Sequence, residues 1–254
     1  MGNAEKFRGK SSDYAKYRER YDAELILPLL RTWCGLTPEW MIADVGAGTG
    51  MLGDVFRANG NAVIAVEPNA EMRALCERLH AGDTWFRVTA GTAEETGLPE
   101  ATVDLVSVGR ALHWFRAEDA MREFRRILKP DGWVAIVAAG REEKGSEENQ
   151  AIEALLQKWS EGRQSTRASY SVYPRLSKFF AGGVLHQVEK AGTMQLEWQE
   201  LRGLMLSISH TPLPESPKFA GFEAELAETF DRLKRNGKIT LVTRCWVNAG
   251  RFAA

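Results

Sequence analysis

The chain alternates two hydrophobic patterns along most of its length. Short runs of apolar residues predict strands, and segments in which apolar residues recur every three or four positions predict helices. The predicted strands are 41–45, 62–66, 85–88, 102–108, 133–138, 184–188, 193–198 and 238–248. The predicted helices are 25–33, 51–59, 68–80, 118–128, 152–159, 201–208 and 219–233. Because strands alternate with helices, the pattern predicts an α/β fold with a largely parallel sheet.

The segment from Met41 to Asn69 predicts a nucleotide-binding βαβ unit. Glycines at 46, 48 and 50 follow its first strand and make a turn tight enough for a ligand to lie against bare backbone. The helix after this turn directs its free N–H groups back at the turn. Glu67 ends the second strand, 21 residues after Gly46, where a carboxylate is placed to accept hydrogen bonds from ribose hydroxyls.

Charge near the turn discriminates between nucleotides. A dinucleotide fingerprint has its third glycine at the position that Met51 occupies, so the glycines of this chain are out of register with it. Asp44 lies directly under the turn, where its carboxylate would repel a pyrophosphate and attract an ammonium or sulfonium group. The pattern therefore favours a nucleoside that carries positive charge.

A family resemblance rests on two motifs. The sequence DVGAGTG at 44–50, followed by VEPNAEM at 66–72, resembles the cofactor motif of class I S-adenosylmethionine-dependent methyltransferases. The wider similarity is to small-molecule methyltransferases of the bacterial type that includes ubiquinone-biosynthesis and trans-aconitate methyltransferases. It extends from about Phe7 to Gly250 and is strongest between Asp44 and Val137.

The resemblance implies a fold and a division of the chain. The expected fold is a Rossmann-like, doubly wound sheet of seven strands. It is mostly parallel with an antiparallel last strand, and a helical lid is added to it. The composition changes at Arg141, and the segment that follows is too long for a plain loop. The predicted parts are an N-terminal helical cap (1–35), a cofactor-binding core (36–140), a helical insertion or substrate lid (141–182) and a C-terminal part of the core sheet (183–254).

The turn and the resemblance together imply S-adenosylmethionine as cofactor and a set of residues around it. The expected cofactor-binding residues are Tyr14, Arg18, Asp44, Gly46, Ala47, Gly48, Thr49, Gly50, Glu67, Pro68, Met72, Thr92, Ala93, Glu94, Arg110 and Ala111. For several of these residues, a purely structural interpretation also stays open. Tyr14 and Arg18 belong to a Tyr-x-x-x-Arg-x-x-Tyr segment similar to one that closes over the cofactor in the family, but an amphipathic helix on the sheet edge fits equally. Met72 fits the core of its helix, and the loop after Thr92 fits a simple cap.

The acceptor side is predicted from the carboxyl end of the fourth strand, where open parallel sheets bind their ligands. The run ALHWF at 111–115 is similar to a segment of the family in which the histidine and the tryptophan line the acceptor pocket. His113 is therefore the candidate general base, although a lone histidine is as often structural. Trp114, Tyr170 from the insertion and His210 are the candidate pocket residues.

Composition restricts the partners. A net charge of −1 gives no electrostatic reason to expect nucleic acid or an anionic membrane, and no apolar run approaches the length of a membrane span. The polar N-terminus has no secretory signal pattern, which predicts a cytoplasmic location. Three cysteines that are far apart and four histidines without ligand spacing predict neither disulfides nor a metal site. The expected partner is a small-molecule methyl acceptor, and the sequence does not indicate an oligomeric state.

The leading functional hypothesis is methyl transfer from S-adenosylmethionine to a small molecule, at an oxygen of a carboxylate or phenol. A carboxylate acceptor needs no base, whereas a phenol would use His113. Two alternatives stay open. A nicotinamide-dependent oxidoreductase would use the same βαβ crevice, and a binder of S-adenosylmethionine without catalytic activity would regulate a partner.

Overall fold

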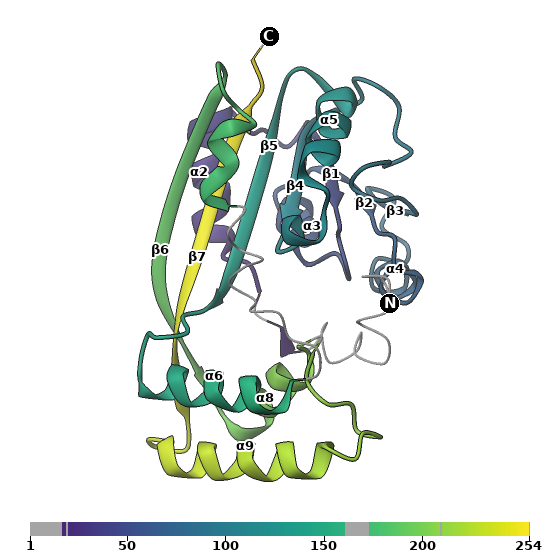
Figure 1. Ribbon diagram of the computed structural model, residues 1–254. Coiled ribbons are helices and arrows are strands. Elements are labelled where there is room, and N and C mark those ends of the chain that lie inside the picture. The colour runs from purple at the N-terminus through teal and green to yellow at the C-terminus, as the bar shows by residue number, and fades with distance from the viewer. Residues whose placement is uncertain (1–16, 19, 161–172, 209, 254) are drawn as a thin grey trace. The chain divides into compact units, whose positions relative to one another are not determined.

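A computed structural model describes residues 17–18, 20–160, 173–208 and 210–253 of the chain. It contains a seven-stranded sheet with the strand order β3-β2-β1-β4-β5-β7-β6 (Figure 1). The strands are β1 (Met41–Val45), β2 (Ala62–Val66), β3 (Phe86–Thr89), β4 (Val103–Gly109), β5 (Leu128–Arg141), β6 (Val184–Leu196) and β7 (Ile239–Arg251). The sheet is mostly parallel with antiparallel end strands, which confirms the expected Rossmann-like α/β class.

Helices connect the strands at the places that the hydrophobic periodicity predicts. They are α2 (Ala23–Cys34), α3 (Met51–Ala58), α4 (Ala70–Leu79), α5 (Ala117–Ile127), α6 (Glu147–Trp159), α8 (Trp198–Leu206) and α9 (Phe219–Leu233), with short 3₁₀ turns η2 (Leu112–Trp114) and η3 (Tyr173–Lys178). Local signals set their ends. The side chain of Asn69 accepts a hydrogen bond from the backbone of Met72 at the start of α4, and Gly35 ends α2 with a φ of 74°.

β5 differs from its prediction. It begins at Leu128 and continues through Lys129–Gly132, the segment that the sequence indicates as a turn. Leu128 pairs with Val103 of β4, and Trp133 pairs with Leu105. More residues separate the two paired positions on β5 than on β4, so the proline and glycine of this segment form an irregularity inside a continuous strand.

β6 also differs from its prediction. The sequence suggests two strands on either side of Ala191–Gly192, but β6 runs unbroken from Val184 to Leu196. A side-chain carbon added to Gly192 would lie 3.1 Å from the hydroxyl of Thr243 in β7. The glycine therefore permits a close approach between the strands and does not end one of them.

Contacts within the described chain group it in two compact units. One contains residues 20–138, 173–188 and 246–253, and its core joins sheet residues such as Val106 and Ile136 to Phe124 of α5. The other contains 17–18, 139–160 and most of 189–245, and its apolar core is formed largely by α6, α8 and α9. The division into four parts predicted from the sequence stays a prediction.

The parallel strands bring the predicted site residues that follow β1, β2 and β4 to one edge of the sheet. β1 pairs with β2 so that Val45 lies opposite Val66, and with β4 so that Asp44 lies opposite Ser107. The segments that follow these strands therefore leave the sheet side by side, at its carboxyl edge. Among the described helices, none combines the length and the apolar character that crossing a membrane requires.

Candidate functional site

The turn between β1 and α3 exposes backbone as the glycine spacing predicts. Gly46, Gly48 and Gly50 all have positive φ values, of 69°, 59° and 90°. A side-chain carbon added to Gly46 would lie 2.8 Å from the Cβ of Ala111, so only glycine fits between the turn and the end of β4. At Gly48 the same carbon would meet no atom within 4 Å. The turn is thus closely packed at Gly46 and open at Gly48.

The Glu67 carboxylate lies against the open part of the turn. Its Oε2 accepts a hydrogen bond from Gly48 N at 2.8 Å, and its Oε1 accepts one from Asn69 N at 2.8 Å. Burial raises the pKa of this carboxyl above its ordinary value, although both hydrogen bonds act to lower it. Because each carboxylate oxygen can accept two hydrogen bonds, Glu67 keeps acceptor capacity for two ligand hydroxyls.

Asp44 is completely buried, with both carboxylate oxygens bonded to the protein. Oδ2 accepts a hydrogen bond from Gly53 N at 3.0 Å, and Oδ1 accepts one from Ser107 Oγ at 2.9 Å. Asp44 therefore ties β1 to the first turn of α3 and to β4. Burial raises its pKa to about 7 in spite of these two hydrogen bonds. The negative charge expected under the turn is then only partly developed at neutral pH, and it acts on a ligand through space.

Thr49 provides a further polar group at the turn. Its side chain is 2 % exposed, and within the described residues its hydroxyl has no hydrogen-bond partner. Buried hydroxyls without a partner are uncommon because losing the hydrogen bonds of water costs free energy. Together with the open backbone of Gly48 and the Glu67 carboxylate, this hydroxyl fits a polar nucleoside ligand.

Arg110 follows β4 and is a buried cation. Its side chain is 5 % exposed, and its φ of 52° is in the left-handed region that few residues other than glycine adopt. Its Nη2 lies 3.7 Å from the sulfur of Met51, the first residue of α3. The guanidinium of this predicted cofactor-binding residue is therefore beside the glycine turn.

η2 lies between β4 and α5. Ala111 packs against Gly46, and the ring of Phe115 would lie 2.9 Å from a side-chain carbon added to the same glycine. Between them, the rings of His113 and Trp114 are tilted against each other with centroids 4.7 Å apart. The structure thus places His113 within a few residues of both contacts to Gly46, and its role as base stays a prediction.

The loop after β3 is held by its own hydrogen bonds. Glu95 N donates to Thr92 Oγ1 at 3.1 Å, and Thr92 N donates to the Glu95 carbonyl at 3.0 Å, which is the loop cap that the sequence leaves open as an alternative. The Glu94 carboxylate accepts a hydrogen bond from Arg116 N at 2.7 Å, and Ala93 is buried. Any contact between these residues and an adenine ring stays a prediction.

The remaining predicted residues divide into three groups. Met72 is buried in α4, which fits the core alternative, and the Pro68 carbonyl accepts a hydrogen bond from Arg73 at 3.1 Å. Arg18 and His210 belong to the compact unit that also contains α6, α8 and α9. Tyr14 and Tyr170 lie outside the described residues. The roles of all these residues stay predictions.

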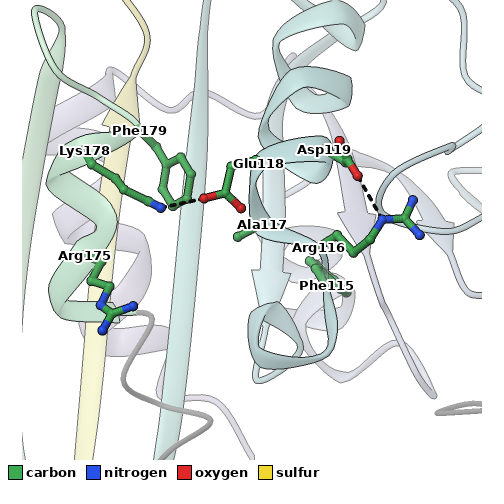
Figure 2. Close-up of a pocket in the computed structure, with 8 residues that line it drawn as sticks. All are labelled: Phe115, Arg116, Ala117, Glu118, Asp119, Arg175, Lys178 and Phe179. Carbon is green, nitrogen blue, oxygen red and sulfur yellow. Dashed lines mark hydrogen bonds and ion pairs between the residues drawn. The ribbon is translucent and has the colours of Figure 1, made fainter.

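A cavity of about 520 Å³ opens at the first turn of α5 (Figure 2). It is lined by Phe115, Arg116, Ala117, Glu118, Asp119, Arg175, Lys178 and Phe179. Lys178 forms an ion pair with Glu118 at 2.6 Å, and Arg116 pairs with Asp119 at 2.8 Å. Figure 2 shows Arg175 pointing away from both pairs. Apart from Phe115, which ends the ALHWF run, these residues carry no signal in the sequence, because no motif links the start of α5 to η3.

No metal centre is formed by the described residues, among which no group of three or more His, Cys, Asp or Glu side chains is arranged to hold an ion.

Comparison with known proteins assigns the family of the region that carries the turn. Residues 43–136 match the methyltransferase domain family. An uncharacterised methyltransferase of Mycobacterium tuberculosis is 34 % identical over 131 residues, which are 52 % of this chain and 51 % of the relative. A malonyl-[acyl-carrier protein] O-methyltransferase of Pectobacterium atrosepticum is 30 % identical over 135 residues, with the same coverage of 52 % and 51 %. The chain spans about half the length of these curated relatives.

The chain also shares its fold with solved methyltransferase structures. A solved structure of a candidate type II methyltransferase from Anaeromyxobacter dehalogenans superposes with a TM-score of 0.65 at 20 % identity, covering 94 % of this chain and all of the other. Residues 43–136 match the methyltransferase domain family in sequence, and most of the chain shares the fold of this solved structure. The chain is thus similar to class I S-adenosylmethionine-dependent methyltransferases.

Proposed function

We propose that this protein transfers a methyl group from S-adenosylmethionine to a small-molecule acceptor. The observation that carries the proposal is the pairing of the open Gly48 backbone with the Glu67 carboxylate at 2.8 Å, at the carboxyl edge of β1 and β2. An acid beside bare backbone suits a nucleoside with ribose hydroxyls and no phosphate. The Asp44 carboxyl, buried below, disfavours a pyrophosphate further as it ionises.

The residues of the chain mainly align the reactants. S-adenosylmethionine supplies a methyl group on a positively charged sulfur, so no further activation of the donor is needed. Glu67 would hold the ribose, and the turn would fix the position of the nucleoside. Holding two reactants near contact is worth up to about 7–11 kcal/mol of a reaction barrier. His113, in η2, would accept the proton if the acceptor is a phenol.

We propose further that the acceptor reacts through an oxygen of a carboxylate or a phenol. The cavity at α5 supports this proposal, because it combines the aromatic rings of Phe115 and Phe179 with the guanidinium of Arg175. Rings pack against an apolar body, and a guanidinium binds a carboxylate through two parallel hydrogen bonds. The resemblance to a malonyl O-methyltransferase is consistent with an acidic acceptor.

Calorimetric titration tests the cofactor. We expect S-adenosylhomocysteine to bind with micromolar affinity and reduced nicotinamide dinucleotides to show no binding. Binding of the dinucleotides alone would replace the proposal with an oxidoreductase.

Incubation with S-adenosylmethionine and a metabolite extract, followed by mass spectrometry, tests the reaction. We expect one or more metabolites to gain 14 mass units while S-adenosylhomocysteine accumulates. If the cofactor binds and neither change is seen, the protein is a binder without catalytic activity.

A further inference from the structure

We propose that Tyr21 is a positioning residue that holds the Arg110 guanidinium where it binds the carboxylate of the cofactor's methionine moiety. This inference rests on the proposed function, because it assigns a protein partner to one end of the cofactor. It is carried by the geometry of four residues in the unit that contains the sheet: Tyr21, Met51, Gly109 and Arg110.

The backbone of Arg110 is fixed in an unfavourable conformation. Its φ of 52° costs on the order of 1 kcal/mol for a residue with a side chain. The conformation is held in place because Arg110 N donates a hydrogen bond to the Val137 carbonyl of β5 at 2.9 Å. This left-handed residue directly follows β4, and its side chain lies beside Met51.

Tyr21 contacts the guanidinium in two ways. Arg110 Nε donates a hydrogen bond to the Tyr21 hydroxyl at 3.1 Å, and the guanidinium carbon lies 4.6 Å from the centre of the Tyr21 ring. A cation over an aromatic face and a charge-assisted hydrogen bond restrict the guanidinium in two directions. With Nε occupied by the hydroxyl, the fork of terminal nitrogens is oriented by Tyr21.

The position of Tyr21 is itself closely defined. A side-chain carbon added to Gly109 would lie 2.4 Å from the Tyr21 hydroxyl, so the phenol fits only because residue 109 has no side chain. The next residue, Asp22, caps α2 by accepting a hydrogen bond from Leu25 N at 3.0 Å. Tyr21 is therefore anchored at the start of α2 and reaches the end of β4, 89 positions later.

Charge indicates what the guanidinium binds. The ribose end of the proposed nucleoside is assigned to Glu67, an acid that would repel a carboxylate. Arg110 is a cation next to Met51, at the start of α3, where the free N–H groups of the helix also favour negative charge. The cofactor carries its only carboxylate at the end opposite the adenine. A planar guanidinium matches this group through paired hydrogen bonds.

The test compares two ligands on the variant Tyr21→Phe. S-adenosylhomocysteine carries the carboxylate, whereas 5′-methylthioadenosine has the same nucleoside and lacks the amino acid. We expect the dissociation constant of S-adenosylhomocysteine to rise about tenfold, equivalent to about 1.4 kcal/mol, and that of 5′-methylthioadenosine to stay unchanged. Partial unfolding of the variant would weaken the binding of both ligands by the same factor. The ratio of the two dissociation constants therefore isolates the effect of the hydroxyl.

A double-mutant cycle shows whether Tyr21 acts through Arg110. Arg110→Met should weaken the binding of S-adenosylhomocysteine more than Tyr21→Phe does. Adding Tyr21→Phe to Arg110→Met should cause no further loss of affinity. Tyr17→Phe is the matched control, because it removes the same hydroxyl from a tyrosine whose ring packs against Gly203. We expect the control to leave both constants unchanged.

The outcomes separate the two proposals. If the unmodified protein binds neither nucleoside, the proposed function fails. If it binds both and Tyr21→Phe leaves their ratio unchanged, or if the two substitutions add fully, the positioning role of Tyr21 is wrong and the proposed function stands.

Discussion

The glycine turn and the cavity at α5 are built in opposite ways. The turn is formed by backbone and by buried acids within one βαβ unit, and Glu67 and Asp44 each accept hydrogen bonds from two protein groups. The cavity is formed by side chains from α5 and η3, with ion pairs that are partly exposed. Exposed ion pairs contribute little to stability, whereas buried and bonded acids fix the local geometry. Under the proposed function, the cofactor would bind to a rigid frame, whereas the acceptor would bind to side chains that are readily exchanged.

The largest effect is expected at the junction between the two regions. His113 lies in η2, between Ala111, which packs against Gly46 of the turn, and Phe115, which lines the cavity. His113→Ala should lower turnover by about 100-fold or more if the histidine is the general base. The affinity for S-adenosylhomocysteine, measured by calorimetry, should stay unchanged. A turnover like that of the unmodified protein would make His113 a structural residue and favour an acceptor that needs no base.

A second large effect is expected at the turn itself. Glu67→Ala removes the hydrogen bonds to Gly48 and Asn69 and those proposed to ribose, so the dissociation constant of S-adenosylhomocysteine should rise by about 100-fold. Glu77→Ala, an exposed acid of α4, is the control. Equal affinities of the two variants for S-adenosylhomocysteine would show that Glu67 does not bind the cofactor.

Asp44 gives an effect that depends on pH. Asp44→Asn can accept from Gly53 N with its amide oxygen and donate from its amide nitrogen to Ser107 Oγ, so the serine contact reverses its direction, but the variant cannot ionise. At pH 8, where a carboxyl of pKa about 7 is mostly charged, the variant should bind S-adenosylmethionine about threefold to tenfold more weakly than the unmodified protein. At pH 6 the two proteins should bind equally. A difference that is the same at both pH values would show that the charge of Asp44 is not what the cofactor senses.

The same carboxyl should make stability depend on pH. Its pKa is about 7 in the folded protein and about 3.9 in an unfolded chain, so the folded state binds the proton more tightly. The stabilisation is complete below about pH 4 and is lost as the pH rises towards 7, by up to about 4 kcal/mol. Urea unfolding at pH 5 and pH 7.5 should therefore show a larger fall for the unmodified protein than for Asp44→Asn. Parallel curves would contradict the shifted pKa.

The smallest effect is expected in the cavity. Arg175→Ala should raise KM for an acidic acceptor by about threefold to tenfold, because an exposed guanidinium is screened by water. It should leave the affinity for S-adenosylhomocysteine and the melting temperature unchanged. Steady-state kinetics with the acceptor found by mass spectrometry would measure it, and an unchanged KM would exclude Arg175 from the acceptor site.

These two regions also differ in how far the sequence predicts them. Gly46, Gly48 and Glu67 lie within 22 residues of one another, and their spacing follows directly from one strand, one turn and one helix. The α/β class and the bounds of α9 and β2 follow equally from periodicity, and the structure confirms them. Local patterns are sufficient where the interacting residues are close in sequence.

Contacts between distant segments could not be predicted in this way. The hydrogen bond from Arg110 to Tyr21 joins residues 89 positions apart, and the left-handed φ of Arg110 has no signal in its residue type. The hydrogen bonds that Asp44 makes to Gly53 and Ser107 depend on the register of β1 with β4. The unbroken β5 shows the same limit, because pairing with β4 keeps Lys129–Gly132 in a strand although the residues themselves favour a turn.

The ring of Phe115 is shared by the glycine turn and the α5 cavity. One edge of the ring closes on Gly46, and the ring also forms part of the wall of the α5 cavity. A methyl group introduced at residue 46 would push the Phe115 ring towards the α5 cavity and reduce the volume of that cavity. A smaller residue at 115 would not by itself make room for that methyl group, because the Cβ of Ala111 would still lie 2.8 Å from it. The width of the cavity wall at Phe115 is therefore tied to the absence of a side chain at residue 46.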